Sequence, residues 1–190
     1  MFDMIIEQPR LVTLDEFEQL LTQPEQQERL LELIHGEIVE KRPTEEHGEI
    51  QLIIGGALRT FVITRKLGRV SVETRHRMPG DTQNSRLPDI SYIAGNRPRV
   101  TEGSVPQMPD LAVEIKSPDD SLKGLREKAQ YYMANGTRMV WLVDPAKRLA
   151  IMLTPDDEQI LLENEALDGG DVLPGFSLPL REVFADPLAE

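Results

Sequence analysis

The segment from residue 109 to residue 144 constrains the fold more than any other part of the chain. It begins with a short strand-like stretch, PDLAVEIK, continues through a helix-like stretch, SPDDSLKGLREKAQYYMANG, and ends in the apolar run RMVWLVD. A strand, a helix and a second strand in this order form a crossover, and crossovers usually join parallel strands. The last strand is apolar throughout, which is typical of a strand buried on both faces. The segment therefore predicts an α/β fold.

The remaining elements extend this prediction to a mixed β-sheet flanked by helices. Thr13 and Glu16 form a capping-box pattern that predicts a helix start. Two apolar runs around His35-Gly36 predict a β-hairpin over 30–42. The spacing of apolar residues predicts a helix over 45–68. Strands are expected over 69–76 and 89–94, and a second hairpin over 148–163. We expect one domain, 1–190, with extra N- and C-terminal hairpins.

The composition excludes several classes of protein. The chain has no Cys, which rules out disulfides, Cys-ligated zinc and a thiol nucleophile and fits a reducing compartment. The stretch MFDMIIEQPR carries an acid at position 3 and only a short apolar run, so we do not expect a signal peptide. No apolar run approaches the roughly 20 residues that a membrane span needs. We therefore expect a cytoplasmic protein with no membrane partner.

Charge is distributed unevenly along the chain. The formal net charge of −12 argues against broad, non-specific binding of nucleic acid. Residues 59–86 nevertheless hold seven Lys and Arg residues against two acids. This basic segment is either a solvated helix end with its loop or a local anion-binding edge, and charge alone favours the first interpretation.

Two strands carry charges that can form a metal site. Glu114 and Lys116 lie on one face of the strand that starts the crossover, and Asp89 opens another strand about 25 residues upstream. If the two strands lie side by side, Asp89 faces Glu114. Two carboxylates suit Mg²⁺, and a lysine beside them supplies charge near a phosphate. The alternative is a solvated sheet face with a surface ion pair that contributes about 0–1 kcal/mol. The expected central position of the strand supports the first interpretation.

Asp110 is a competing partner for Glu114. It also follows a proline, but it lies four residues earlier on the same strand and face, about 13 Å away at ~3.3 Å per residue. One ion cannot contact both residues. We therefore prefer Asp89, and we expect Asp110 to cap a strand end or to orient a neighbour.

Other residues are candidates for supporting roles. Lys128 and Tyr132 are spaced i, i+4 on the crossover helix; either they reach the same site, or Tyr132 is core and Lys128 packs its stem beside it. Glu37 is either a third acidic ligand or a turn residue of the hairpin. His47 lies near a helix start, where it is a candidate base or phosphate contact. The chain has three His residues without ligand spacing, so a zinc site is not expected.

Four blocks of sequence resemble a known family when they are taken together and in order. They are LELIHGEIVEKRPTEEHG, RLPDISYIA, PDLAVEIKSPDDSLKGLREKAQYYMANGTRMVWLVDP and LDGGDVLPGFSLPL. This combination is similar to the Uma-two family, a group placed among the PD-(D/E)XK, restriction-endonuclease-like nucleases. The resemblance covers about residues 28–184.

The resemblance implies a restriction-endonuclease-like core and a phosphodiesterase site that uses Mg²⁺ (or Mn²⁺). On this chain the motif's acidic residues are Asp89 and Glu114, which would bind the metal together with the carbonyl group of Ile115. The motif's lysine is Lys116. Lys128 matches a recurrent helix lysine of the family, so either lysine is a candidate to face the phosphate.

The expected function is therefore an endonuclease that hydrolyses phosphodiester bonds in DNA. Glu37 and His47 match recurrent family positions with supporting roles. A homodimer is expected, because two sites related by a twofold axis would cut both strands. Two alternatives stay open: a catalytically silent module that keeps the fold and binds nucleic acid or serves assembly, and a structural dimer with no role on nucleic acid.

Overall fold

The computed structural model describes residues 10–186 and residue 188. The stretch at 1–10 that was not expected to be a signal peptide therefore lies almost entirely outside the described residues. Within the described part of the chain, no helix is both long enough and apolar enough to cross a membrane.

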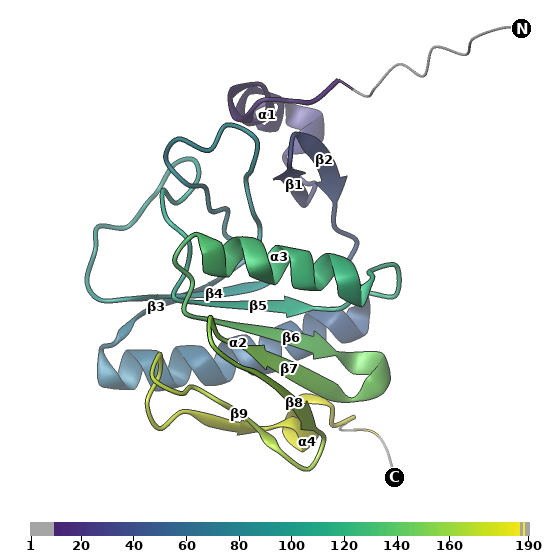
Figure 1. Cartoon of the computed structure of the whole chain (residues 1–190), viewed down its shortest axis with the longest axis vertical. Helices are drawn as coiled ribbons and strands as arrows, with labels where there is room; N and C mark the ends of the chain where they lie inside the picture. The colour runs from purple at the N-terminus through teal and green to yellow at the C-terminus, as the bar shows by residue number, and fades with distance from the viewer. Residues whose placement is uncertain (1–9, 187, 189–190) are drawn as a thin grey trace, which may run out of the picture.

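A six-stranded mixed sheet forms the centre of the molecule (Figure 1). The pairing of β5 with β6 is parallel, as the crossover predicted, and the other neighbours are antiparallel. The strands that lie in the middle are buried along their whole length. In sheet order the strands are β3 (Gly68–Val72), β4 (Ile90–Ala94), β5 (Leu111–Ile115), β6 (Met139–Asp144), β7 (Leu149–Leu153) and β8 (Glu158–Leu162).

Two long helices cover the two faces of this sheet (Figure 1). Helix α2 (Glu45–Arg65) begins at a Thr44 cap and packs on the face that includes Val113 and Trp141. Helix α3 (Leu122–Ala134) begins at a Ser121 cap and packs on the opposite face. Alternate residues of β5 thus enter separate core layers, which places Glu114 on the α3 side.

The predicted N-terminal hairpin forms a separate two-stranded sheet of β1 (Leu31–Ile34) and β2 (Glu37–Glu40). His35 and Gly36 both have positive φ, 51° and 81°, as a tight hairpin turn of the primed type requires. The capped helix α1 (Leu14–Leu21) and the 3-10 turn η1 (Pro24–Gln26) pack beside it. The hairpin joins the rest of the molecule through paired backbone bonds of 2.9 Å between Leu33 and Ser85.

The C-terminal part differs in detail from the expectation. The predicted hairpin over 148–163 does not stand apart, because β7 pairs with β6 and extends the main sheet. After it, β9 (Ala166–Asp168) and β10 (Ser177–Pro179) form a further antiparallel pair beneath α2, followed by α4 (Leu180–Val183). Phe176 anchors this segment, since its ring contacts those of Phe61 and Trp141. The 3-10 turn η2 (Pro145–Lys147) links β6 to β7.

The topology gathers several chain ends at one edge of the sheet. The carboxyl ends of β5 and β6, the N-terminus of α2 and the chain leaving β2 all lie on the same side, on the right in Figure 1. Because β4 runs antiparallel to β5, its first residues reach this edge as well.

Candidate active site

Asp89 and Glu114 face each other at this edge. The register pairs Ile90 with Val113, so one step further along the two strands Asp89 falls opposite Glu114. Each is about 1% exposed. The backbone N–H of Ile115 donates a hydrogen bond of 2.6 Å to Oδ2 of Asp89, which fixes that carboxylate against β5. The structure thus brings the two predicted acidic residues together.

A lysine that the sequence did not indicate lies between these carboxylates. Lys41 directly follows β2, and its ammonium group forms an ion pair with Oδ1 of Asp89. The same nitrogen lies 3.4 Å from Oε2 of Glu114 and donates to the carbonyl oxygen of Leu87 at 3.0 Å. No local pattern separates Lys41 from other cations of the chain, since its position depends on how the hairpin docks.

A second lysine and a third buried carboxylate extend the cluster. Nζ of Lys128, from α3, lies 2.5 Å from Oε2 of Glu32 and 3.4 Å from Oε2 of Glu114. Glu32 is fully buried in β1, and its Oε1 accepts from the backbone N–H of Leu87 at 2.8 Å. Glu37, the acidic residue expected from the hairpin, is exposed at the start of β2 and is not part of this cluster. The sequence signal that could have identified Glu32 is an acidic residue within the apolar run LLELI.

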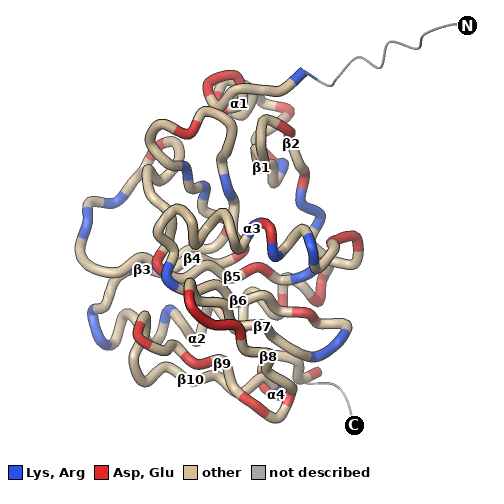
Figure 2. Tube along the Cα trace, viewed as in Figure 1, with Lys and Arg blue, Asp and Glu red and all other residues tan. Residues whose placement is uncertain are grey.

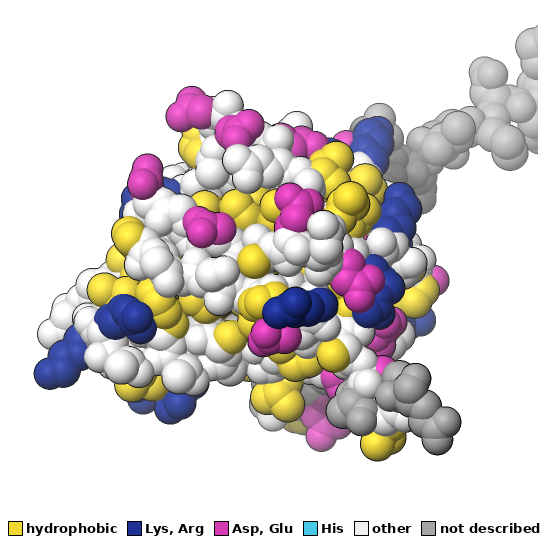
Figure 3. Space-filling model, turned by 90° about the horizontal axis from the view of Figure 1, so that it is seen from below, with side chains coloured by type: hydrophobic (Ala, Val, Ile, Leu, Met, Phe, Trp, Pro, Cys, Tyr) yellow, Lys and Arg dark blue, Asp and Glu magenta, His cyan; other side chains and the backbone are white. Residues whose placement is uncertain are grey.

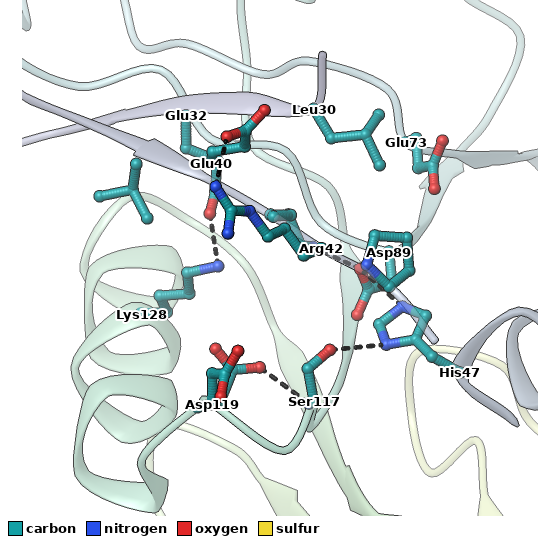
Figure 4. A pocket seen from close by; sticks show the side chains of 14 residues that line it. Leu30, Glu32, Glu40, Arg42, His47, Glu73, Asp89, Ser117, Asp119 and Lys128 are labelled. Atoms are coloured by element: carbon teal, nitrogen blue, oxygen red, sulfur yellow. Dashed lines mark hydrogen bonds and ion pairs between the residues drawn. The ribbon is translucent and has the colours of Figure 1, made fainter. Parts of the chain in front are cut away.

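Tyr132 and His47 contact the two central carboxylates. The hydroxyl group of Tyr132 donates to Oε1 of Glu114 at 2.6 Å, so the expected i, i+4 pair with Lys128 does reach the site. In the first turn of α2, Nε2 of His47 lies 3.3 Å from Oδ1 of Asp89, and Nδ1 lies 3.3 Å from Oγ of Ser117 (Figure 4). Both side chains therefore restrict how the carboxylates are oriented.

Burial and charge shift the pKa values of the cluster in different directions. Burial raises the pKa of Glu114, and the nearby lysines offset only part of that rise. Burial alone would also raise the pKa of Asp89, but Lys41 and His47 outweigh it and lower this pKa to about 2. The pKa values of both lysines are raised because the buried carboxylates favour their charged forms over the opposing effect of burial. The carboxylates of the cluster therefore keep both lysines in their charged forms.

Lys116 and Asp110 lie outside this network. The strand ends at Ile115, and the ammonium group of Lys116 donates to the carbonyl oxygen of Ser117 at 3.2 Å. Within the described residues Lys116 forms no ion pair with Asp89 or Glu114. Asp110 accepts from the backbone N–H of Ala94 at 2.8 Å, at the far end of β4. It orients a neighbouring strand, as expected.

The cluster opens into a small pocket (Figure 4). Its volume is about 120 Å³, well below the 300–1,000 Å³ of pockets for drug-sized ligands. It would therefore admit an ion or a phosphate group rather than a whole nucleotide. It is lined by the hairpin and the chain leaving it, the first turn of α2, the residue before β4, the β5–α3 connection and α3, including Glu32, Lys41, Arg42, His47, Asp89, Ser117, Asp119 and Lys128.

Three oxygen atoms around the ammonium group of Lys41 are suitable ligands for a hard cation. Oδ1 of Asp89, Oε2 of Glu114 and the carbonyl oxygen of Leu87 converge on one positive charge, the ammonium group of Lys41. In the described part of the chain no three His, Asp or Glu side chains are grouped as a metal cage. Mg²⁺ does not require such a cage, because it usually binds one or two carboxylates and retains several waters.

The basic segment 59–86 does not form one surface. The guanidinium group of Arg75 donates to the carbonyl oxygen of Leu31, Arg77 lies 3.6 Å from Glu18, and Arg86 is buried. The remaining cations follow α2 into β3, away from the edge where β2 ends (Figure 2). Seen from below, Lys and Arg form separate patches (Figure 3). The segment is therefore not a continuous anion-binding edge.

Comparison with known proteins identifies the fold and the family. The mixed six-stranded sheet flanked by helices is of the restriction-endonuclease-like type. Residues 14–181 match the model of the Uma2 family, described as "Putative restriction endonuclease". The chain belongs to this family, which confirms the resemblance seen in the sequence.

A solved structure agrees with this assignment. The crystal structure of "a putative nuclease belonging to DUF820" from Anabaena variabilis ATCC 29413 is 28% identical, with a TM-score of 0.77 over 91% of this chain and 97% of that one. A chain of the DrdV–DNA complex is 18% identical, with a TM-score of 0.36 over 75% of this chain and 14% of its own length. Among curated proteins, no match is found. The family and the Anabaena structure support a nuclease function.

Proposed function

We propose that the protein is a Mg²⁺-dependent endonuclease that hydrolyses phosphodiester bonds in DNA. The observation that carries this proposal is the convergence of Asp89 and Glu114 on a single cation, the ammonium group of Lys41, beside a small pocket that Asp89 and Lys41 line. Carboxylates buried as a facing pair repel each other unless a cation binds between them. The membership of the Uma2 family supports a nuclease function.

In this proposal Asp89 and Glu114 hold the metal, with the carbonyl group of Ile115 as a further oxygen ligand. A bound Mg²⁺ would polarise the phosphate group and lower the pKa of a water molecule. Tyr132 and the N–H of Ile115 fix the carboxylate orientations.

Lys128 lines the pocket and adds positive charge against the negative charge that develops on the phosphate. The sequence left open whether Lys116 or Lys128 faces the phosphate, and this proposal gives that role to Lys128. His47, held between Asp89 and Ser117, lines the pocket and supports the orientation of the Asp89 carboxylate.

The volume of the pocket determines how a nucleic acid would approach. At about 120 Å³ it takes one phosphate group, so the strand would lie across the mouth. Arg42 lines this mouth, and its side chain is 80% exposed, which suits a backbone contact. A homodimer, with one pocket for each strand, is part of the same proposal.

The test is cleavage of supercoiled plasmid by the full chain with Mg²⁺ or Mn²⁺. We compare wild type with Asp89→Asn and Glu114→Gln, and use Glu102→Gln, on an exposed loop, as the matched control. Each active-site variant should lose about a hundredfold or more in rate. Each factor of ten in that loss corresponds to about 1.4 kcal/mol of lost transition-state stabilisation.

Two outcomes would count against the proposal. Cleavage that survives Glu114→Gln would show that the activity does not come from this site. Wild type that retains DNA in a salt-sensitive manner, yet cleaves it with neither metal, would favour the silent binding module.

A further inference from the structure

The position of the Lys41 ammonium group has a consequence for metal binding. Its three oxygen neighbours, Oδ1 of Asp89, Oε2 of Glu114 and the carbonyl oxygen of Leu87, are the hard donors that a divalent cation prefers. An ammonium group and a metal ion cannot both occupy the point where these oxygens converge. Metal binding at this pair therefore has to be an exchange.

The charges of the cluster indicate which lysine would be exchanged. Lys128 lies closer to Glu32, at 2.5 Å, than to Glu114, at 3.4 Å, so it keeps a partner of its own. Lys41 forms its ion pairs with Asp89 and Glu114, which are the predicted metal ligands. A divalent ion on these two carboxylates would replace the charge of Lys41 and leave the pair of Lys128 with Glu32 intact.

The local chain gives Lys41 a route away from the carboxylates. It lies in the connection between β2 and α2, next to the exposed residues Arg42 and Pro43, which line the mouth of the pocket. Its own side chain is 14% exposed. A lysine head on a flexible four-carbon stem can swing from the floor toward the mouth without a change in the sheet.

We propose that Lys41 is a resident counter-cation that leaves Asp89 and Glu114 when a divalent metal binds and then points to the mouth of the pocket. The proposal rests on the metal-dependent function proposed above. It makes metal affinity the result of a competition with a built-in positive charge. It also couples metal to substrate, because a phosphate at the mouth would offer the displaced ammonium group a new partner.

Calorimetric titration with Mn²⁺ tests this proposal on the full chain. Lys41→Met should bind Mn²⁺ about tenfold or more tightly than wild type, because a like charge near the ligands has been removed. Lys66→Met is the matched control, since α2 separates it from the pocket by about 30 Å at 1.5 Å per residue. Its affinity should equal that of wild type.

Two results would overturn the proposal in distinguishable ways. Unchanged or weaker binding by Lys41→Met, with wild type binding Mn²⁺, would overturn the exchange and leave the metal-dependent function standing. Absence of Mn²⁺ binding in wild type and in both variants would overturn the exchange and the metal-dependent function together.

A second measurement uses wild type alone and does not require that Lys41→Met folds. The full chain is acetylated briefly with and without saturating Mn²⁺, and the modification of each lysine is read by mass spectrometry. Lys41 should become severalfold more reactive with Mn²⁺, whereas exposed Lys66 should not change. Reactivity of Lys41 that stays the same or falls would overturn the exchange.

Discussion

The hydroxyl group of Tyr132 donates a hydrogen bond of 2.6 Å to Oε1 of Glu114, deep between α3 and the sheet. Both residues are almost fully buried, so this contact decides which Glu114 oxygen turns toward Lys41 and Lys128. Oε1 accepts the hydrogen bond of Tyr132, and Oε2 faces the ammonium groups of Lys41 and Lys128. Tyr132 is thus a positioning residue for the carboxylate.

Tyr132→Phe should lower the free energy of unfolding by about 1–3 kcal/mol, because a buried carboxylate oxygen loses its donor. The affinity for Mn²⁺ should also fall, by about tenfold, since Glu114 is free to rotate. Urea denaturation and calorimetry measure the two effects. Tyr131→Phe, whose hydroxyl group donates to Asp81 instead, is the matched control for metal affinity. Equal Mn²⁺ affinity in wild type and Tyr132→Phe would contradict the positioning role.

Removing Lys128 should affect stability far more than removing Lys116. Lys128→Met leaves Glu32 without its ion pair and Glu114 with one fewer, which costs about 3–5 kcal/mol for a buried pair. Lys116→Met removes a single contact to a backbone carbonyl group, and about 0.5 kcal/mol is expected. Denaturant titration of both variants measures this difference. If the two losses were equal, the ion pairs of Lys128 would not contribute as the geometry indicates.

His76 should make the fold sensitive to mild acid. Its ring is fully buried, Nδ1 bonds the carbonyl oxygen of Gln107, and Nε2 has no hydrogen-bond partner among the described residues. Burial lowers the pKa of His76 from 6.5 to about 4. Because the folded state binds this proton more weakly than the unfolded state, the folded protein is disfavoured as the pH falls from 6.5 toward 4. The loss is about 3 kcal/mol over that window.

Urea denaturation between pH 7 and pH 4 measures this dependence. His76→Gln should flatten it, whatever its effect on stability at pH 7. His35→Gln is the matched control, because His35 is exposed, and it should keep the slope of wild type. A slope that persists in His76→Gln would assign the acid sensitivity to other groups.

Asp110 offers a test of the assignment among the acidic residues. Asp110→Ala removes the hydrogen bond to the N–H of Ala94 and should cost about 1 kcal/mol in unfolding free energy. Its Mn²⁺ affinity should stay within twofold of wild type, because the carboxylate lies at the other end of β5. A large loss of Mn²⁺ binding in this variant would make Asp110 a ligand and would contradict the choice of Asp89.

The parts of the fold that local pattern determines were predictable. The cap at Thr13, the turn at His35-Gly36 and the crossover of 109–144 all form as expected. Asp89 and Glu114 were also predictable, because strand alternation and pairing place them. The roles of these two residues as metal ligands stay predictions.

The rest of the site depends on tertiary contacts that no local pattern encodes. Glu32 and Lys41 reach the pocket because the hairpin docks against the chain near Leu87. The sequence indicated Glu37 as a candidate acidic ligand, yet it falls on the exposed strand of the same hairpin. Lys116 lies beyond the last residue of β5, where alternation no longer fixes the direction of a side chain.

The separate hairpin also changes how the pocket responds to thermal fluctuation. Glu32 and Lys41 come from a two-stranded sheet of its own, whereas Asp89 and Glu114 belong to the main sheet. A local opening that lifted the hairpin would remove one carboxylate and one ammonium group together and leave the main sheet folded. The free energy that keeps the hairpin docked is therefore also the free energy that keeps the ammonium group of Lys41 between Asp89 and Glu114.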